Sequence, residues 1–377
     1  MRMSNNRMPT QKEIADSLGI SRGTVDRALH NRKGVSEDTK TVIVEKVKQL
    51  GYTPNRLASF LSTGRTLNIA MITPADPLWE SVKEGARAFA AVMGGHVVNI
   101  SWFETGVHDL QRETELLRRA LESGVDGIGI APADPNRLKD LIDGAIDRHI
   151  AVVTLNTDAP ESRRICFVGQ DPYLAGRIAG ELMGNFLMGS GRVVAITAFR
   201  NVLVHKQRLD AFLGIIGERY RGIDVVEVLE NHDSDVEACE QIRALLRRTR
   251  DVNGVYLTSG IGPGGVVRAL DEVGLAGTVR VVCFDYFPET VRLIQRGLVH
   301  ATIGQDPFTQ GYQTVKILYD YVIERMEPAS KIVHTKADIG LRENIDLLVG
   351  EERFRRVSAT SDESAVPRIG NALARES

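Results

Sequence analysis

The chain has 377 residues, 43% of them hydrophobic, which at roughly 100–200 residues per domain predicts two or three packed domains. No run reaches the roughly 18 apolar residues that a membrane helix needs, and the first ten residues lack the apolar stretch of a secretory signal, so we expect a cytoplasmic protein without a membrane partner. The net charge of -2 is unevenly divided: residues 1–66 carry 12 Lys and Arg against 6 Asp and Glu, which leaves the remainder at about -8. A basic head on an acidic body is typical of a nucleic-acid-binding module joined to a domain of another kind, although a solvated basic arm would have the same charge.

Two short helices with a tight turn between them are predicted from residue 10 onward. Thr10 and Glu13 have the spacing of a capping box, which starts a helix that Gly19 ends. Ser21 can cap the second helix. The apolar positions of that helix, expected to face inward, are Val25, Ala28 and Leu29. Its outward positions, a candidate base-reading surface, are Arg22, Gly23, Asp26 and Arg27.

A third helix is predicted from the cap at Ser36 to Leu50, where Gly51 follows. The three helices share one small core. A second helix that follows a tight turn and carries arginines near its start can enter a major groove about 12 Å wide, so the pattern favours a helix-turn-helix. The alternative is a purely structural bundle.

The segments TQKEIADSLGISRGTVDRALHNRKGVSEDTK and GYTPNRLASFL resemble the DNA-binding head of the LacI/GalR repressors over residues 9–65. The resemblance implies a hinge helix that forms on DNA, because Pro54, Asn55, Ala58 and Leu61 match the family's hinge pattern. Leu61 would wedge between base pairs from the minor groove. Without the resemblance, the same stretch is simply a linker. The DNA contacts implied are Thr10, Ser21, Arg22, Gly23, Thr24, Arg27, Asn31, Asn55, Ala58 and Leu61.

Two departures from the family limit this transfer. Asp26 stands where the family usually has a small polar residue, and Arg22 followed by Gly23 is an unusual reading pair. The operator sequence therefore does not carry over. We expect only a palindromic, double-stranded operator bound by a homodimer, since one short hinge helix contributes little binding energy alone.

Short β-rich runs alternate with amphipathic stretches from residue 67 to residue 305. The alternation indicates parallel sheets covered by helices, and the number of runs suits two doubly wound lobes better than one sheet. The runs are LNIAMIT, HVVNISW, DGIGIAP, IAVVTLN, RICFVG, RVVAITA, DVVEVL, GVYLTS, RVVCFD and HATIGQ.

Ligands of such lobes bind beyond the carboxyl ends of the strands. The side chains expected there are mostly acceptors and amides with one aromatic ring, a set that suits a polyhydroxylated ligand. They are Asp76, Trp79, Asn156, Asp158, Gln170, Asp171, Ser259, Asp285, Gln305 and Asp306. Each of them could instead be a helix cap.

Residues 67–340 also resemble the ribose-type periplasmic binding proteins and the sensor domains of the same repressors, through TPADPLWESVKEGA, TLNTDAP, VGQDPYLAGRIAGELM, HKQRLDAF and VVCFDYFPETVRLIQRGLVHATIGQDPFTQGY. Leu78 and Trp79 replace two phenylalanines of the ribose-type proteins, and Asn156 with Thr157 replaces an Asp-Arg pair, so ribose itself is disfavoured. A plain surface ion pair is the alternative for Arg208. The ligand contacts that the resemblance implies are Asp76, Leu78, Trp79, Asn156, Thr157, Arg208, Ser259, Asp285 and Gln305, to which the strand ends add Asp158 and Gln170.

A rival motif lies at Gly260, Gly262 and Gly265, which have dinucleotide-binding spacing, with Asp285 ending the next strand. A NAD-dependent dehydrogenase or a sensor of a sugar phosphate would use such a loop, because backbone N–H groups at a helix start bind phosphate. We do not prefer the enzyme, since no catalytic acid and base pair is evident. We therefore expect no catalytic residue and no cofactor.

The three cysteines and the HDSD segment at 232–235 show no metal-ligand spacing, so we expect no metal site. The isolated histidines, for which surface or capping positions are expected, are His149, His205, His300 and His334.

The sequence thus predicts an α/β protein: an all-α helix-turn-helix head with a hinge helix, then two doubly wound parallel-sheet lobes of the type I periplasmic-binding-protein kind. Its function would be that of a transcriptional regulator, and a repressor is the expectation, whose effector is a sugar, polyol or sugar phosphate bound between the lobes. The alternative from another class is a solute-binding protein of a transporter, which the basic head disfavours. The expected segments are a head at 1–53, a hinge at 54–66, a sensor at 67–350 and a flexible tail at 351–377. Within the sensor, one lobe would comprise about 67–170 and 306–335, and the other about 171–305 and 336–350.

Overall fold

The computed structural model describes residues 10–29, 33–50, 60, 64–94, 97–106, 109–249 and 251–350. The chain divides into two compact units, Met1–Gly64 and Arg65–Ser377. Four of the residues implied in DNA binding lie outside the described residues: Asn31, Asn55, Ala58 and Leu61. The tail at 351–377 lies outside them as well.

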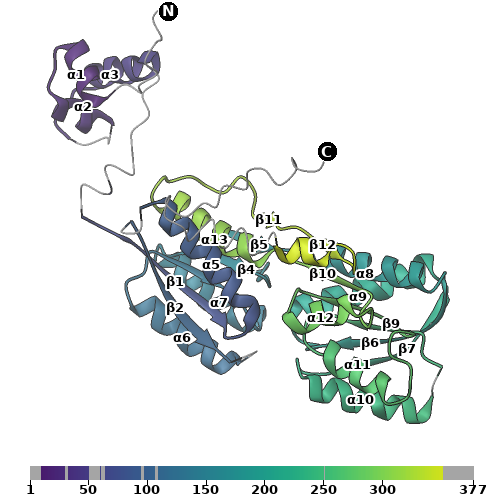
Figure 1. Ribbon diagram of the computed structural model, residues 1–377. Helices are drawn as coiled ribbons and strands as arrows, with labels where there is room; N and C mark the ends of the chain where they lie inside the picture. The colour runs from purple at the N-terminus through teal and green to yellow at the C-terminus, as the bar shows by residue number, and fades with distance from the viewer. Residues whose placement is uncertain are drawn as a thin grey trace, which may run out of the picture. The chain divides into compact units, whose positions relative to one another are not determined.

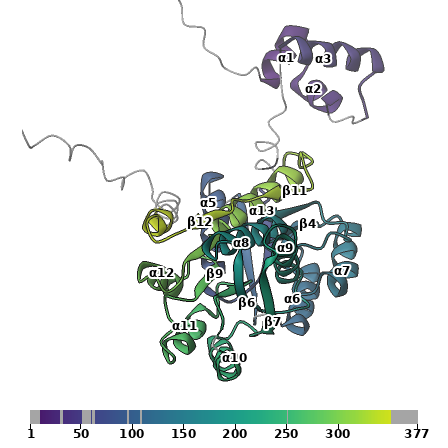
Figure 2. The ribbon, with the colours of Figure 1, turned by 90° about the vertical axis from the view of Figure 1, so that its right-hand side faces the viewer.

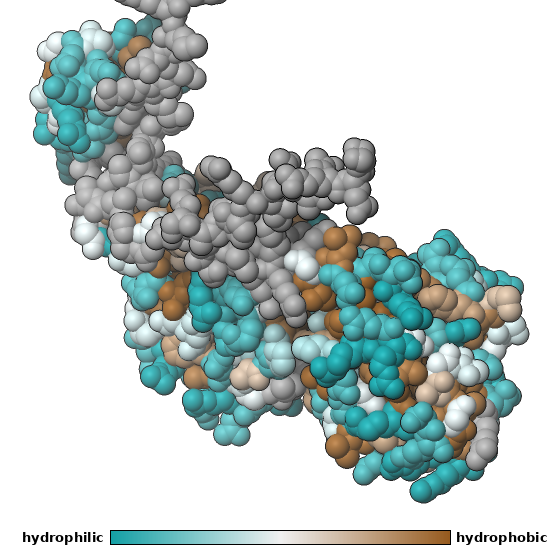
Figure 3. All heavy atoms as spheres, in the orientation of Figure 1, coloured by the Kyte–Doolittle hydropathy of each residue, from teal (hydrophilic) through white to brown (hydrophobic). Residues whose placement is uncertain are grey.

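The first unit is built on three helices, α1 (Gln11–Leu18), α2 (Arg22–Leu29) and α3 (Glu37–Leu50). The capping box is confirmed: Glu13 N–H donates to the Thr10 hydroxyl at 3.3 Å, and Thr10 N–H donates to the Glu13 carboxylate at 2.6 Å. Gly19 ends α1 in the left-handed conformation, with φ of 64°. The small shared core is confirmed too, and consists of Ile14, Ala15, Val25, Ala28 and Ile43. The face of this unit that Figure 3 presents is mostly hydrophilic.

The second unit contains two six-stranded sheets, which Figure 1 shows as separate lobes. The first sheet has the order β11-β5-β4-β3-β1-β2, with all neighbouring strands parallel. Its strands are β1 (Leu67–Pro74), β2 (Val98–Thr105), β3 (Gly127–Ile130), β4 (Ala151–Leu155), β5 (Cys166–Gly169) and β11 (Ile332–His334). One face is covered by α5 (Pro77–Val92) and α13 (Pro307–Val322), the other by α6 (Leu110–Glu122) and α7 (Pro135–Asp147).

The second sheet has the order β12-β10-β9-β8-β6-β7. Its strands are β6 (Ser190–Thr197), β7 (Gly222–Glu230), β8 (Gly254–Leu257), β9 (Arg280–Phe284), β10 (Ala301–Gly304) and β12 (Asp338–Gly340). The layer of α8 (Pro172–Phe186) and α9 (Leu203–Arg219) covers one face, and α10 (Asp235–Arg248), α11 (Pro263–Asp271) and α12 (Pro288–Gln295) cover the other. In Figure 2 this lobe stands in front of the first.

The ten predicted strands are all present, and the α/β architecture is confirmed. Two further strands, β11 and β12, were not predicted. Each has three residues and is partly exposed, so neither has the apolar run that marks the buried strands. β12 also pairs antiparallel with β10, which is an exception to the expected parallel order.

The chain passes between the lobes three times, after β5, after β10 and after β11. These crossings leave a cleft beyond the carboxyl ends of the strands of both sheets, where the βα turns of the two lobes face each other. Among the described helices, none has both the length and the apolar character that crossing a bilayer requires.

Candidate ligand-binding cleft and DNA-binding surface

In the turn between β1 and α5 of the first lobe, an aspartate and a tryptophan are hydrogen-bonded to each other. Asp76 caps α5, where its carboxylate accepts from Leu78 N–H at 2.9 Å and from the Trp79 indole N–H at 2.9 Å. Because the indole is held by the cap, the buried Trp79 ring has one fixed orientation against the cleft.

The turn after β4 supplies the next two polar side chains of this lobe. Asn156 is in the left-handed region, with φ of 64°, and its amide donates to Gln305 Oε1 at 2.9 Å. Thr157 is buried, and its hydroxyl has no hydrogen-bond partner among the residues that the structure describes. An unpaired buried hydroxyl is costly, and a bound ligand would supply the missing partner.

Arg208 is the central side chain of the second lobe. It lies on α9, is 2% exposed, and its guanidinium lies 3.8 Å from the centre of the Phe284 ring. Its terminal nitrogens donate to Thr258 O at 3.0 Å and Gln170 Oε1 at 3.0 Å, while Nε has no partner within the described part of the chain. The alternative interpretation of Arg208 as a surface ion pair is therefore excluded, and burial lowers the pKa of Arg208.

Asp285 and Gln305 join the two lobes. Asp285 follows β9 with φ of 63°, and Gln305 Nε2 donates to its carboxylate at 2.7 Å. Burial raises the pKa of Asp285 to about 6, an effect that Arg208 opposes and that Asp76 and Asp233 reinforce. Because Gln305 follows β10 and precedes α13, its amide bonds Asn156 of one lobe and Asp285 of the other from a crossing segment.

These groups enclose a cavity of about 80 Å³ between the lobes, called here the inner chamber. Nine of the sequence-predicted ligand residues line it: Asp76, Leu78, Trp79, Asn156, Thr157, Arg208, Ser259, Asp285 and Gln305. Two do not. Gln170 lies behind Arg208 and holds it, and the Asp158 carboxylate binds Arg164 and the Thr154 hydroxyl.

Sequence reasoning missed several side chains that line the inner chamber. The polar ones are Thr105, Glu113, His205 and Asp233, and the apolar ones include Val204, Ile261 and Phe287. Asp233 accepts from the Ser259 hydroxyl at 2.6 Å. His205 is buried, so the expected surface or capping position for this histidine is wrong.

Glu113 is 3% exposed and accepts from Ala133 N–H at 3.0 Å. Its burial raises its pKa to about 8, opposed by that hydrogen bond and reinforced by Asp134. The sequence could have identified this residue, because Glu113 lies between Leu110 and Leu117 on the face of α6 that packs into the core. An acid within an apolar stripe indicates a buried polar contact.

The glycines of the rival motif have a packing role. A Cβ atom at Gly265 would lie 1.9 Å from Asp235 O, so the missing side chain lets α11 approach α10. Gly265 N–H already donates to the Asp235 carboxylate at 2.7 Å, and a Cβ atom at Gly264 would meet the Glu289 carboxylate at 2.3 Å. Carboxylates of the chain therefore occupy the start of α11, where a phosphate or dinucleotide would have to bind.

The second helix of the head presents a polar, basic face. Arg22, Gly23 and Arg27 are exposed on α2, and Asp26 is partly exposed. Ser21 caps the helix by accepting from Thr24 N–H at 3.1 Å. An exposed helix with two arginines, held on a small core after a tight turn, has the form of a groove-binding element.

A helix-turn-helix head followed by a two-lobed, polar cleft defines a ligand-responsive, DNA-binding transcriptional regulator. Comparison with known families agrees: residues 10–55 match the bacterial regulatory proteins, lacI family, and residues 69–325 match a periplasmic binding protein domain. The chain belongs to the LacI family of regulators with a periplasmic-binding-protein sensor domain. This is a family of regulators and sugar-binding domains and not a family of enzymes.

Named relatives include regulators of similar length. The chain is 25% identical over 354 residues to the transcriptional regulator CelR of Thermobifida fusca, which covers 88% of this chain and 98% of that protein. It is 26% identical over 268 residues to AglR of Rhizobium meliloti, covering 70% and 74%. Among solved structures, the glucose-galactose binding protein GanP of Geobacillus stearothermophilus matches with a TM-score of 0.70 and 27% identity, covering 74% of this chain and 99% of GanP.

Proposed function

We propose that the protein binds a palindromic operator as a homodimer and acts as a repressor whose operator affinity is set by a sugar or polyol in the inner chamber. The observation that carries the proposal is the hydrogen-bonded path from Asn156 through Gln305 to Asp285, which spans both lobes at the ligand site. A ligand that bonds to these groups stabilises one lobe arrangement over another, and this differential affinity is what can alter DNA binding.

The charge of the inner chamber supports an uncharged effector. Its carboxyl groups are Asp76, Glu113, Asp233 and Asp285, of which Glu113, with its pKa of about 8, is mostly uncharged at neutral pH. Its described lining contains one arginine and no lysine. Carboxylates accept well from sugar hydroxyls but repel phosphate and carboxylate ligands. The carboxylates of Asp235 and Glu289 lie at the start of α11. The glycine motif there is therefore no longer an argument for a sugar phosphate as effector.

Two measurements test the proposal. Isothermal titration calorimetry should find a neutral monosaccharide that binds, while its phosphate ester binds at least tenfold more weakly. Selection of operators from random DNA by the full chain, followed by gel shift with and without that sugar, should give a symmetric site and a changed affinity. The direction of the change assigns the effector as inducer or corepressor.

The DNA surface has its own test. Arg22→Ala and Leu61→Ala should each weaken binding to the selected operator. Lys40→Ala on α3 should only reduce the electrostatic attraction to DNA, and so should weaken binding to the operator and to unrelated DNA equally. An operator affinity insensitive to both substitutions would exclude the proposed contacts. A footprint lacking two-fold symmetry would exclude the homodimer on a palindrome.

A further inference from the structure

A second cavity, called here the lateral chamber, lies beside the inner chamber. It has a volume of about 460 Å³, and its walls come from both lobes. The first lobe supplies Pro77, Leu78, Glu80, Ser81 and Pro307. The remaining walls are formed by Asp285, Tyr286, Phe287, Pro288, Val291, Arg292, Gly304, Gln305 and Val349. Four side chains line both chambers: Leu78, Asp285, Phe287 and Gln305.

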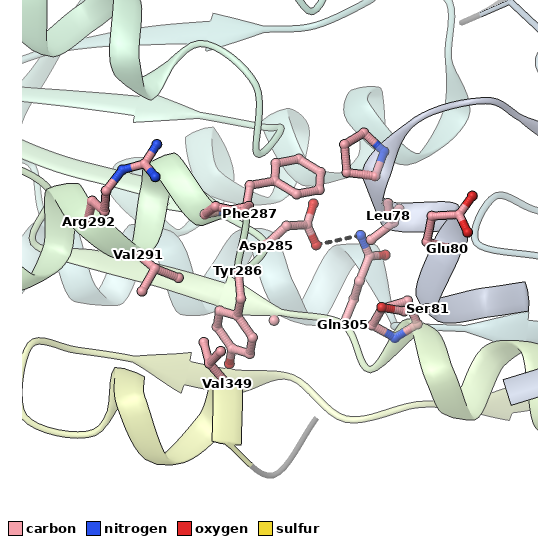
Figure 4. Close-up of a pocket in the computed structure, with 14 residues that line it drawn as sticks. Leu78, Glu80, Ser81, Asp285, Tyr286, Phe287, Val291, Arg292, Gln305 and Val349 are labelled. Carbon is pink, nitrogen blue, oxygen red and sulfur yellow. Dashed lines mark hydrogen bonds between the residues drawn. The ribbon is translucent and has the colours of Figure 1, made fainter. Parts of the chain in front are cut away.

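The boundary between the chambers is polar and shared. Figure 4 shows the Asp285 carboxylate and the Gln305 amide joined by their 2.7 Å hydrogen bond, with the side chains of Leu78 and Phe287 near them. A ligand hydroxyl bound to Asp285 would therefore lie at the boundary, and a group attached to that hydroxyl would enter the lateral chamber.

The walls of the lateral chamber suit a second sugar ring. Tyr286, Phe287, Val291 and Val349 supply rings and apolar groups, and Figure 4 shows Tyr286 and Val349 close together on one side. The Tyr286 hydroxyl is fixed by donating to Asp338 O at 3.0 Å, so its ring position is set. Apolar and aromatic faces stack on the C–H face of a pyranose.

Polar groups at the outer walls can bind the hydroxyls of such a ring. Glu80 and Arg292 lie on opposite sides of the chamber in Figure 4. Arg292 is exposed and has no ion-pair partner among the described residues, so its donors are available.

The volumes of the two chambers bear on the size of the ligand. Small-molecule sites usually measure roughly 300–1,000 Å³. The inner chamber alone is well below that range at about 80 Å³, whereas the lateral chamber is within it. Building on the function proposed above, we propose that the effector is a two-ring glycoside, whose first ring bonds to Asp285 and Gln305 at the boundary and extends its hydroxyls into the inner chamber, while the second ring lies in the lateral chamber. Its second ring contacts both lobes and so adds to the stabilisation of one lobe arrangement.

The test fills the lateral chamber without altering the inner one. Val291→Trp and Val349→Trp each place a large ring in the lateral chamber from a different element, and neither residue lines the inner chamber. Val236→Trp, at a position 62% exposed on α10, is the matched control. Calorimetry on the full chain uses glucose, galactose and xylose, and maltose, cellobiose, lactose, melibiose and xylobiose, which contain them.

We expect at least one two-ring sugar to bind tenfold or more tightly than the monosaccharides it contains. Val291→Trp and Val349→Trp should remove that gain and leave monosaccharide affinity within twofold, while Val236→Trp changes neither. Equal affinity for one-ring and two-ring sugars, or a gain that survives both substitutions, overturns the inference and leaves the proposed function standing. Binding of no sugar in either series overturns both.

Discussion

Arg208 is buried beside the inner chamber, where three neutral oxygens and the Phe284 ring hold its guanidinium. Its Nε is buried and has no hydrogen-bond partner among the described residues, and the side chain lines the inner chamber. Arg208→Met keeps much of the volume and removes the donors, and we expect sugar affinity to fall at least 100-fold. Calorimetry measures the loss, and thermal melting verifies folding. Arg177→Met, which breaks an exposed pair with Glu218 on the same lobe, is the control and should bind sugar normally.

Glu113 makes the stability of the protein depend on pH in a predictable direction. Its folded pKa of about 8 exceeds the ordinary value of 4.5, so the folded state holds this proton longer than the unfolded state does. The stability that protonated Glu113 contributes is complete below pH 4.5 and is lost as pH rises towards 8 and through it. Between pH 6.5 and 8 the loss amounts to about 2 kcal/mol.

Urea unfolding at pH 6.5 and pH 9 measures this dependence. Glu113→Gln should flatten the difference between the two pH values, whereas Glu115→Gln, half-exposed on the same helix, should not. Asp285 contributes little to this pH dependence, because its pKa of about 6 lies below the range between pH 6.5 and pH 9. An unchanged pH difference in Glu113→Gln would contradict a buried, protonated Glu113.

Residue types at strand ends selected six side chains of the inner chamber, because βα turns converge at one edge of each sheet. The other three, Leu78, Thr157 and Arg208, were selected only through the resemblance to the ribose-type binding proteins. Glu113 and His205 were missed because both lie inside helices, where a polar residue was taken to face solvent. Asp158 was selected from its position at a strand end, yet its carboxylate binds Arg164. Position along the chain identifies the correct edge of the sheet, whereas the direction of a side chain depends on partners distant in sequence.

At the scale of elements, the contact between α10 and α11 requires a residue without a side chain. Gly265→Ala places a Cβ atom 1.9 Å from Asp235 O in the unrelaxed structure, so the two helices must separate. We expect a loss of about 3 kcal/mol in the free energy of unfolding, a size typical of overpacking between rigid elements. Chemical denaturation of the full chain measures it.

Gly217 provides the comparison for that substitution. It lies in α9, and a Cβ atom there would have nothing within 4 Å. Gly217→Ala should therefore be neutral or stabilise the protein by up to about 1 kcal/mol, since alanine favours a helix. If Gly265→Ala were as mild as Gly217→Ala, the glycine motif would be free for another role, and the phosphate-binding interpretation would regain support.

Burial explains why ten strands were predicted from the sequence and two were not. The ten predicted strands are mostly buried runs between helices, and burial on both faces makes a strand apolar throughout. β11 and β12 are three-residue edge strands that pair after the chain has crossed between lobes. Their pairing is decided by long-range topology, which no local pattern records.

At the scale of the whole molecule, regulation requires that the sensor respond as a unit to the effector. Gln305 is the residue at which this requirement can be tested, because it lies on a crossing segment and its amide bonds groups of both lobes. Without the Gln305 amide, each lobe should still bind the ligand, but the hydrogen bonds that link Asn156 of one lobe to Asp285 of the other would be lost. The expected consequence is weaker coupling between sugar and operator, beyond any loss of sugar affinity.

Gln305→Ala tests this coupling when sugar is supplied at saturating concentration. The quantity measured is the ratio of operator dissociation constants with and without sugar, and allosteric coupling typically amounts to about 1–3 kcal/mol. We expect the ratio in Gln305→Ala to fall towards one, while Gln295→Ala, whose amide bonds Asp346 at the surface, keeps the ratio of the unaltered protein. A saturating sugar concentration removes the effect of weaker sugar binding. An unchanged ratio in Gln305→Ala would therefore show that the two lobes are coupled through the other crossings, after β5 or β11.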